Sequence, residues 1–166
     1  MNFNTQKLSP KKLTPLVALE KMKNWCAYQE RSQFEVRNKL FEYGIFNEEA
    51  ENIIIQLIQE NFLNEERFAI AFARGKFRIK RWGKIKIKLE LKQHKVSEYC
   101  INKALKQIDG NEYFATLEKI IEKKIKEIKE PNKIKKQYKI IKYAMSRGYE
   151  QDIIMDAIKN LENNES

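Results

Sequence analysis

Apolar side chains recur every three or four positions along nearly the whole chain, a spacing that places them on one side of an α-helix. The pattern begins after Thr14-Pro15 and continues to Leu161, with short interruptions at turn residues. Glycine and proline are scarce, at 5 and 3 of 166 residues, which argues against a turn-rich sandwich or barrel. The sequence therefore predicts an all-α fold.

The expected helices fall into three similar groups. Three helix-ending positions, Gly44, Lys95 and Gly148, each follow an apolar residue by four positions and are 51 and 53 residues apart. A period of this length is typical of helical arrays built from small units that bury their apolar faces by stacking. We expect three tandem three-helix repeats that form an elongated, curved array. The repeats are expected at residues 14–62, 63–110 and 111–162, after a flexible N-terminal tail of residues 1–13.

Local signals predict where several of these helices start and stop. Thr14-Pro15 is a favourable helix start, and Ser32 with Glu35 forms a capping box. Asn47 is expected to cap the next helix. Lys95 stands where the other two groups have glycine, so either the turn differs there or a strain of about 1 kcal/mol is tolerated. The positions expected to face the core include Leu16, Leu19, Met22, Cys26, Val36, Leu40, Ile54, Ile58, Phe68, Phe72, Ile85, Leu89, Ile101, Ile121, Ile134, Tyr138, Ala144 and Ile154. Ile87 is a further candidate on the helix that carries Ile85 and Leu89.

The net charge of +10 is concentrated in two segments of the chain. Residues 72–95 contain ten basic residues and one acidic residue, Glu90, whereas residues 119–142 contain ten basic and three acidic residues. Charge this local suits an anionic partner. The second segment is also compatible with a solvated face, because its glutamates partly neutralise it. The first segment is the stronger candidate for binding.

The first basic segment supplies the candidate site. Its arginines suit phosphate or carboxylate, and lysines four residues apart share one face of a helix. Phe72, Phe77 and Trp82 are interleaved with them, as in surfaces that stack single-stranded nucleic acid, although the helical spacing favours burial of these rings. The residues expected to contact the partner are Arg74, Lys76, Arg78, Lys80, Arg81, Lys84 and Lys88.

Catalytic and metal-binding patterns are weak throughout the sequence. The single histidine, His94, cannot form a zinc motif by itself, and Cys26 and Cys100 lie on or near apolar stripes, where small buried thiols are expected. Gly75-Lys76 lacks the remainder of a phosphate-binding loop. We expect a protein that is not an enzyme and that needs neither a cofactor nor a metal.

The order of motifs resembles the RecX family of bacterial RecA regulators. The matching residues are Asn64-Glu65-Glu66-Arg67-Phe68-Ala69, Phe72 and the pattern Gly83-x-x-x-Ile87-x-x-Glu90-Leu91. Upstream, Ser32-x-x-Glu35-Val36-x-x-Lys39-Leu40-x-x-x-Gly44 is similar to the first repeat of the family. Downstream, Arg147-Gly148-Tyr149 with Ile153-Ile154 is similar to its last repeat. The resemblance spans about residues 16–162, with Glu65 in place of a common Asp and Lys95 in place of Gly.

This resemblance implies a modulator that binds the RecA filament, reduces ATP hydrolysis and strand exchange, and in some members contacts DNA. Composition alone leaves two alternatives open. One is a sequence-independent DNA- or RNA-binding repeat protein that acts without RecA, and the other is a helical scaffold for a different protein.

The remaining features concern the compartment and the assembly. Two cysteines exclude a disulfide framework, which favours a reducing compartment. No apolar run approaches the roughly 20 residues of a membrane helix, and residues 1–12 lack the apolar segment of a secretory signal. We expect a cytoplasmic monomer that does not bind membranes.

Overall fold

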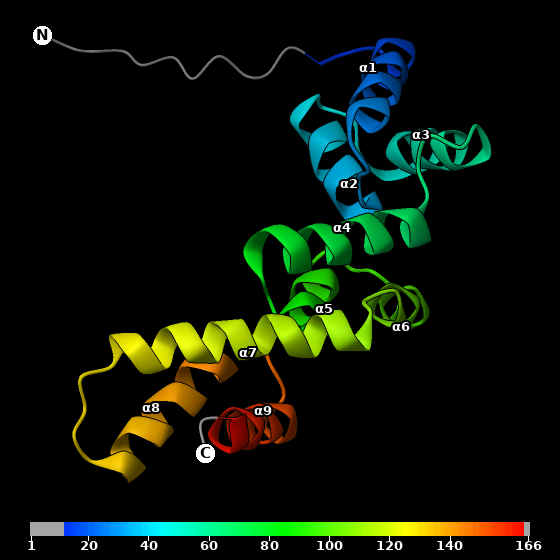
Figure 1. Ribbon diagram of the computed structural model, residues 1–166. Helices are drawn as coiled ribbons and strands as arrows, with labels where there is room; N and C mark the ends of the chain where they lie inside the picture. Colours follow the sequence, from blue (N-terminus) through cyan, green and yellow to red (C-terminus); the bar gives the residue numbers. More distant parts are fainter. Residues whose placement is uncertain (1–11, 165–166) are drawn as a thin grey trace, which may run out of the picture. The chain divides into compact units, whose positions relative to one another are not determined.

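The computed structural model describes residues 12–164, in which nine α-helices and no strands are found (Figure 1). This confirms the predicted all-α fold. The chain divides into two compact units, residues 1–68 and 69–166, and the boundary lies inside one helix. Residues 1–11 of the expected N-terminal tail lie outside the described part of the chain.

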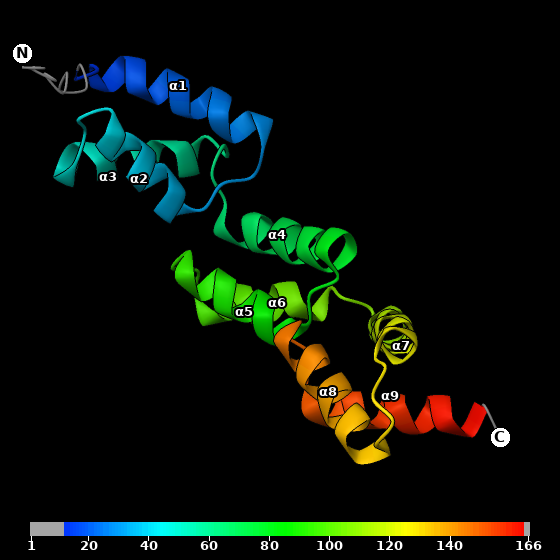
Figure 2. The ribbon, with the colours of Figure 1, turned by 90° about the vertical axis from the view of Figure 1, so that its left-hand side faces the viewer.

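The first unit is built from α1 (Pro15–Tyr28), α2 (Gln33–Glu42) and α3 (Asn47–Gln59). Helix α3 packs against both α1 and α2 (Figure 2). Leu13 joins this unit, since its backbone N–H donates to the Tyr43 carbonyl at 3.0 Å and its side chain packs against the core. The buried core of this unit consists of Ala18, Leu19, Met22, Cys26, Val36, Leu40, Ile45, Ala50, Ile53, Ile54, Leu57 and Leu63.

The second unit contains most of α4 (Glu65–Lys80), then α5 (Lys84–Gln93), α6 (Glu98–Lys106), α7 (Gly110–Glu127), α8 (Lys133–Ser146) and α9 (Gln151–Asn164). Helices α5 and α6 pack together, and α7, α8 and α9 pack against one another (Figure 1). Buried residues of these helices include Phe77, Ile87, Leu91, Ile101, Ala104, Tyr113, Leu117, Ile121, Ile140, Ala144, Ile154 and Ala157.

The same helix-ending motif occurs at the three positions that mark the predicted period. Gly44 has a φ of +74°, and the N–H of the next residue, Ile45, donates to the Leu40 carbonyl at 2.9 Å. Equivalent bonds of 3.2 and 3.3 Å follow Lys95 and Gly148, whose φ values are +58° and +94°. These are Schellman ends. Their recurrence confirms the helical repeat, and Lys95 adopts the strained left-handed conformation rather than a different turn.

Most of the predicted caps are present, with one exception. Ser32 and Glu35 form the capping box, and the Thr14 hydroxyl accepts the Val17 N–H at 3.4 Å. The prediction for Asn47 is wrong, because Phe46 occupies the N-cap position and makes no side-chain bond. Ile45 is fully buried after the Schellman end, and the next residue, Phe46, is extended with a φ of −151° before α3 begins at Asn47, so the cap falls one residue before Asn47.

Six of the residues expected in the core are exposed instead. On α5, Ile85 and Leu89 face outward while Ile87 and Leu91 are fully buried. Two residues correspond to about 200° around a helix, so a stripe placed two positions away lies on the opposite side. The same displacement applies to α8, where Ile140 is buried in place of Tyr138. The exposed residues are Leu16, Ile58, Ile85, Leu89, Ile134 and Tyr138.

None of the helices in residues 12–164 is long and apolar enough to cross a membrane.

The elongated, curved form of the array stays a prediction.

Candidate functional site

The seven predicted contact residues come from two helices and the turn between them. Four project from the second half of α4, one lies in the turn, and two lie on α5. The last turn of α4 carries Arg78 and Lys80, whose positive charges are favourable near a helix C-terminus. In chain order the residues are Arg74, Lys76, Arg78, Lys80, Arg81, Lys84 and Lys88.

Backbone hydrogen bonds hold the α4–α5 turn against the α8–α9 turn. The Gly83 N–H donates to the Arg147 carbonyl at 2.8 Å, and the Ile85 N–H donates to the Gly148 carbonyl at 3.0 Å. The Tyr149 hydroxyl donates to the Arg81 carbonyl at 3.0 Å. Arg81 has a φ of +54°, so this contact stabilises a backbone conformation that arginine rarely adopts. The site is therefore positioned by residues distant in the sequence.

Tyr113 of α7 supports the start of α5. Its hydroxyl oxygen accepts the Lys84 N–H at 3.0 Å, and the hydroxyl donates to the Glu150 carboxylate at 2.5 Å. The Phe77 and Tyr149 rings lie 5.7 and 5.0 Å from the Tyr113 ring. Burial, together with the bond to Glu150, raises the pKa of Tyr113 well above its ordinary value. Burial also raises the pKa of Tyr149, to about 12.

The interleaved aromatic residues are not a free stacking surface. Phe77 is buried in the core, and Phe72 is half-buried with its ring 5.4 Å from that of His94. Trp82 is half-buried, and the Nζ atoms of Lys76 and Lys86 lie 4.9 and 4.4 Å from its ring. These cation–π contacts fix the two lysines over the indole. The expectation of burial holds fully for Phe77 and partly for the other two rings.

The seven basic side chains do not share one exposed face. Arg74, Arg78, Lys80 and Arg81 are exposed, whereas the half-buried Lys88 donates to Glu98 at 2.5 Å. That hydrogen bond lowers the pKa of the Glu98 carboxyl. The ammonium group of Lys88 is therefore paired with a carboxylate of the protein itself. The other members also have internal contacts. The Lys84 Nζ lies 4.9 Å from the Tyr113 ring, the Lys76 Nζ lies over Trp82, and Arg78 lies 3.8 Å from Glu112.

The structure brings further cations next to Arg81 that the sequence-based set lacks. Arg81 shares the lining of a cavity of about 270 Å³ with Lys119, Lys123 and Lys124 of α7 and with Arg147. The sequence signal for the three lysines was the second basic segment together with the four-residue spacing of Lys119 and Lys123, whereas Arg147 lies outside that segment. It was weak because Glu122 and Glu127 are mixed into that segment.

The described residues contain no cluster of three or more side chains suited to holding a metal ion. Cys26 and Cys100 are buried and are not joined in a disulfide. Burial raises the pKa of the Cys26 thiol to about 11, which keeps it protonated and weakly nucleophilic near neutral pH.

These features define a class of protein, an all-α repeat with a basic surface. The model of the second three-helix domain of RecX matches residues 64–105, and the model of the third three-helix domain matches residues 111–158. Together the two matches cover more than half of the sequence. The chain belongs to the RecX family.

Relatives and solved structures agree with this assignment. The regulatory protein RecX of Clostridium perfringens (strain 13 / Type A) is 34% identical over 138 residues, which cover 81% of this chain and 64% of the relative. The regulatory protein RecX of Pelodictyon phaeoclathratiforme is 28% identical over 133 residues, which cover 80% of this chain and 81% of the relative. The chain thus spans slightly less than two thirds of the clostridial protein. The crystal structure of RecX from Lactobacillus salivarius has the same fold, with a TM-score of 0.81, 24% identity, and coverage of 89% of this chain and 96% of that one.

Proposed function

We propose that this protein binds the RecA–DNA filament and modulates RecA in DNA repair, homologous recombination and the SOS response. Its main effect is inhibition of RecA's ATPase, recombinase and strand-exchange activities. The observation that carries the proposal is the family match over residues 64–105 and 111–158, because the first of these segments contains all seven predicted contact residues. The relatives described above bear the name regulatory protein RecX.

The basic surface supports the proposal on physical grounds. A filament assembled on DNA presents phosphate groups and acidic protein surface, and both attract localised positive charge. Among the seven contact residues, Arg74, Arg78, Lys80 and Arg81 are exposed. Arg78 is paired with Glu112, so the other three are the strongest candidates for direct contact. Regulation of this kind needs neither a catalytic residue nor a cofactor.

Membership of the RecX family also bears on the repeats, the compartment and the assembly of this protein. We infer three-helix repeats at residues 14–62, 63–110 and 111–162, and a cytoplasmic protein that acts as a monomer. Short capped helices that share a recurring Schellman end support the repeat boundaries.

Single-strand-dependent ATP hydrolysis by the cognate RecA tests the proposal directly. This protein is titrated into the reaction at physiological salt, and inhibition is expected at levels well below that of RecA, because one bound regulator affects a whole filament. A protein with equal size and charge but unrelated fold serves as the control. Unchanged hydrolysis at equimolar protein would contradict the proposal.

The second candidate function is sequence-independent binding of DNA or RNA without RecA. The concentration of ten basic residues within residues 72–95 favours it. Its signature is binding to bare nucleic acid that weakens steeply as salt rises. Strong, salt-sensitive binding of bare nucleic acid, together with unchanged ATP hydrolysis by RecA, would favour this second function over RecA regulation.

A further inference from the structure

Helix α8 has two apolar stripes, and only one of them faces the core. Ile140 and Ala144 are buried where α8 packs against α7 and α9 (Figure 1). Successive residues are about 100° apart around a helix, so a second stripe is centred about 110° from this buried pair. The second stripe, here called the α8 seam, consists of Ile134, Tyr138, Ile141 and Met145.

The α8 seam is open to solvent within residues 69–166. Ile134, Tyr138 and Met145 are 80%, 64% and 48% exposed, and Ile141 is half-buried. Single exposed apolar side chains are common on protein surfaces, whereas a continuous row of them is typical of interaction sites. The seam is roughly 16 Å long and covers nearly the whole helix. Packing within the protein therefore does not account for these four residues.

The spacing of the α8 seam is that of a coiled coil. Its residues are four, three and four positions apart, which is the a/d pattern of a heptad repeat. Tyr138 and Met145 occupy a positions, and Ile134 and Ile141 occupy d positions. A strict a/d stripe is narrower than the face by which a helix packs into a globular core. The seam therefore suits a single partner helix.

Two lysines flank the α8 seam on one side. In the same heptad register the e positions are Lys135 and Lys142, and both residues are exposed. Among the described residues neither ammonium group has a carboxylate partner, whereas Lys139 is paired with Glu130 at 3.0 Å. Charged residues at e pair with residues of the facing helix and determine which helix binds. Lysines seven residues apart therefore select a partner with carboxylates at the same spacing.

The same lysines argue against a second copy of this chain as the partner. In an antiparallel pair of α8 helices the e positions face each other, so lysine would oppose lysine. In a parallel pair e faces g, and the g positions are Gln137 and Ala144, which carry no charge. Neither arrangement places a carboxylate opposite Lys135 or Lys142. Charge complementarity therefore requires a different, acidic helix.

We propose that the α8 seam binds an amphipathic helix of a partner protein, with apolar residues at its a and d positions and carboxylates beside them. The partner's apolar side chains cover the seam, and its carboxylates pair with Lys135 and Lys142. Two heptads of the partner, about 14 residues, match the length of the seam. This interaction goes beyond the proposed function, because α8 carries none of the seven residues predicted for RecA and DNA contact.

The test uses a designed three-heptad peptide with leucine at a and d and glutamate at e and g. Repulsion between its glutamates keeps this peptide from pairing with itself. Fluorescence anisotropy with the full-length chain and no RecA measures binding, and NMR chemical shifts of the isotope-labelled protein locate it. Saturable binding is expected, with shift changes centred on residues 134–145. The control ligand has lysine at e and g and is expected to bind about tenfold more weakly.

Removal of the apolar contacts tests the α8 seam itself. The variant I134Q/Y138Q replaces two exposed residues with a good helix former, so the fold is retained. Binding of the glutamate peptide is expected to weaken about tenfold or more. The matched control is I85Q/L89Q on α5, where both residues are also exposed and lie four positions apart. The control is expected to bind the peptide as wild type does, and I134Q/Y138Q is expected to inhibit RecA hydrolysis normally.

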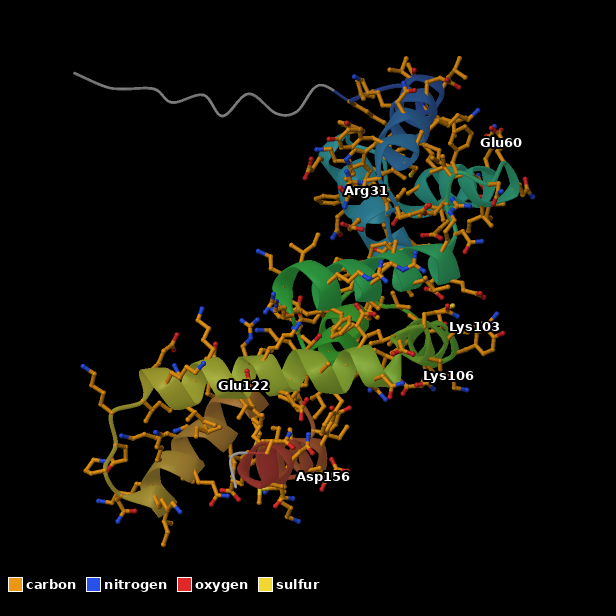
Figure 3. The ribbon with its side chains drawn as sticks, viewed as in Figure 1. Arg31, Glu60, Lys103, Lys106, Glu122 and Asp156 are labelled. Carbon is orange, nitrogen blue, oxygen red and sulfur yellow. The ribbon has the colours of Figure 1, made fainter. Side chains whose placement is uncertain are left out.

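Charge reversal at the e positions tests the choice of partner. The variant K135E/K142E is expected to lose affinity for the glutamate peptide and to gain about tenfold for the lysine peptide. A folding defect would not produce this gain. The matched control is K103E/K106E, which has the same change in net charge, and both of its lysines project from α6 (Figure 3). The control is expected to keep the preference for the glutamate peptide, and circular dichroism checks the fold of every variant.

Several outcomes would overturn the proposal. Absence of binding by the glutamate peptide, or equal loss in I134Q/Y138Q and I85Q/L89Q, would mean that the α8 seam takes no helix. Shift changes centred on residues 74–88 would mean that the peptide binds the first basic segment. A dimer that I134Q/Y138Q disrupts would assign the seam to a second copy. Binding to anionic lipid vesicles that I134Q/Y138Q abolishes would assign it to a membrane surface. Loss of RecA inhibition in I134Q/Y138Q would transfer the seam to the proposed function and remove the separate partner.

Discussion

At the scale of single residues, Gly83 shows how closely two turns of the chain approach each other. A Cβ atom at Gly83 would lie 2.1 Å from the Gly148 carbonyl oxygen, and one at Gly148 would lie 2.3 Å from the Lys86 Cβ. Atoms cannot approach to these distances, so both glycines are required for the contact between the α4–α5 and α8–α9 turns. The contact positions Arg81 at the cavity that it lines with Lys119 and Arg147.

The variant G83A is therefore expected to lower the free energy of unfolding by about 3 kcal/mol or more, because the added methyl group must displace backbone. The matched control is G75A, since Gly75 lies inside α4 and a methyl group added there would meet no other atom within 4 Å. That substitution is expected to stabilise the protein by about 0.5–1 kcal/mol. Urea unfolding of both variants measures the difference. Equal stabilities would show that the two turns do not make this contact in solution.

Tyr149 makes a second residue-scale prediction, on the pH dependence of stability. Burial raises its pKa to about 12 from an ordinary value of 10, so the folded protein keeps this proton while the unfolded chain releases it. A raised pKa in the folded state gives stability that is present below pH 10 and is lost as the pH rises towards 12. The expected loss from Tyr149 is about 2 kcal/mol.

The measurement compares the unfolding free energies of wild type and Y149F between pH 9 and 12. The phenylalanine variant starts lower because it lacks the hydrogen bond to the Arg81 carbonyl, and the gap is expected to narrow as the pH rises. The control is Y138F, because Tyr138 is exposed and its replacement is expected to leave the pH dependence unchanged. A constant gap between wild type and Y149F would contradict the prediction.

At the scale of helices, the three Schellman ends show how a repeat is encoded locally. Each combines a left-handed residue with a following residue that is buried: Ile45, Val96 or Tyr149. Two of the three left-handed positions have glycine, and Lys95 is the exception. The side chain of Lys95 adds strain that the buried Val96 and its backbone bond to the Leu91 carbonyl offset.

The variant K95G is expected to raise the free energy of unfolding by up to about 1 kcal/mol, because glycine adopts the left-handed conformation without steric cost. The control is K106G at the end of α6, where φ is helical and glycine is expected to destabilise by a similar amount. Thermal or urea unfolding measures both changes. A destabilised K95G would mean that the lysine makes a contact worth more than its strain.

Helix positions were predicted better than helix orientations. Thr14 and Ser32 are local signals, and the chain uses both as predicted because caps depend on residues only three or four positions away. The outward-facing Ile85 and Leu89 on α5 were not predictable, because every second residue from Ile85 to Leu91 is apolar and either stripe satisfies the helical period. Packing against α6 selected Ile87 and Leu91.

At the scale of the whole molecule, the basic residues act by position more than by number. Among the seven residues predicted for RecA and DNA contact, Lys88 is paired with Glu98 and Lys76 is held over Trp82. The exposed members on α4 and its following turn are expected to dominate contact with the filament. The charge pattern of the sequence did not distinguish these exposed residues from Lys76 and Lys88, which have contacts within the protein.

Charge reversal of the exposed group, R74E/K80E, is expected to weaken filament binding at least tenfold while leaving the helical circular dichroism intact. The matched control is K103E/K106E on α6, which makes the same change in net charge. Co-sedimentation with RecA assembled on single-stranded DNA measures the binding. Filament binding equal to that of wild type would reject this patch, while inhibition of RecA hydrolysis would still test the proposed function separately.

The sequence by itself determined the all-α class, the threefold recurrence of helix ends, most caps and the family, because these depend on local chemistry and on the order of motifs. Only the tertiary structure decided which apolar stripe of α5 and α8 is buried, that Tyr113 and Tyr149 position the α4–α5 turn, and that Lys119 and Lys123 line a cavity with Arg81. The two tyrosine contacts, for example, join residues 29 and 68 positions apart. No local pattern specifies such contacts, because they arise only when separate helices pack together.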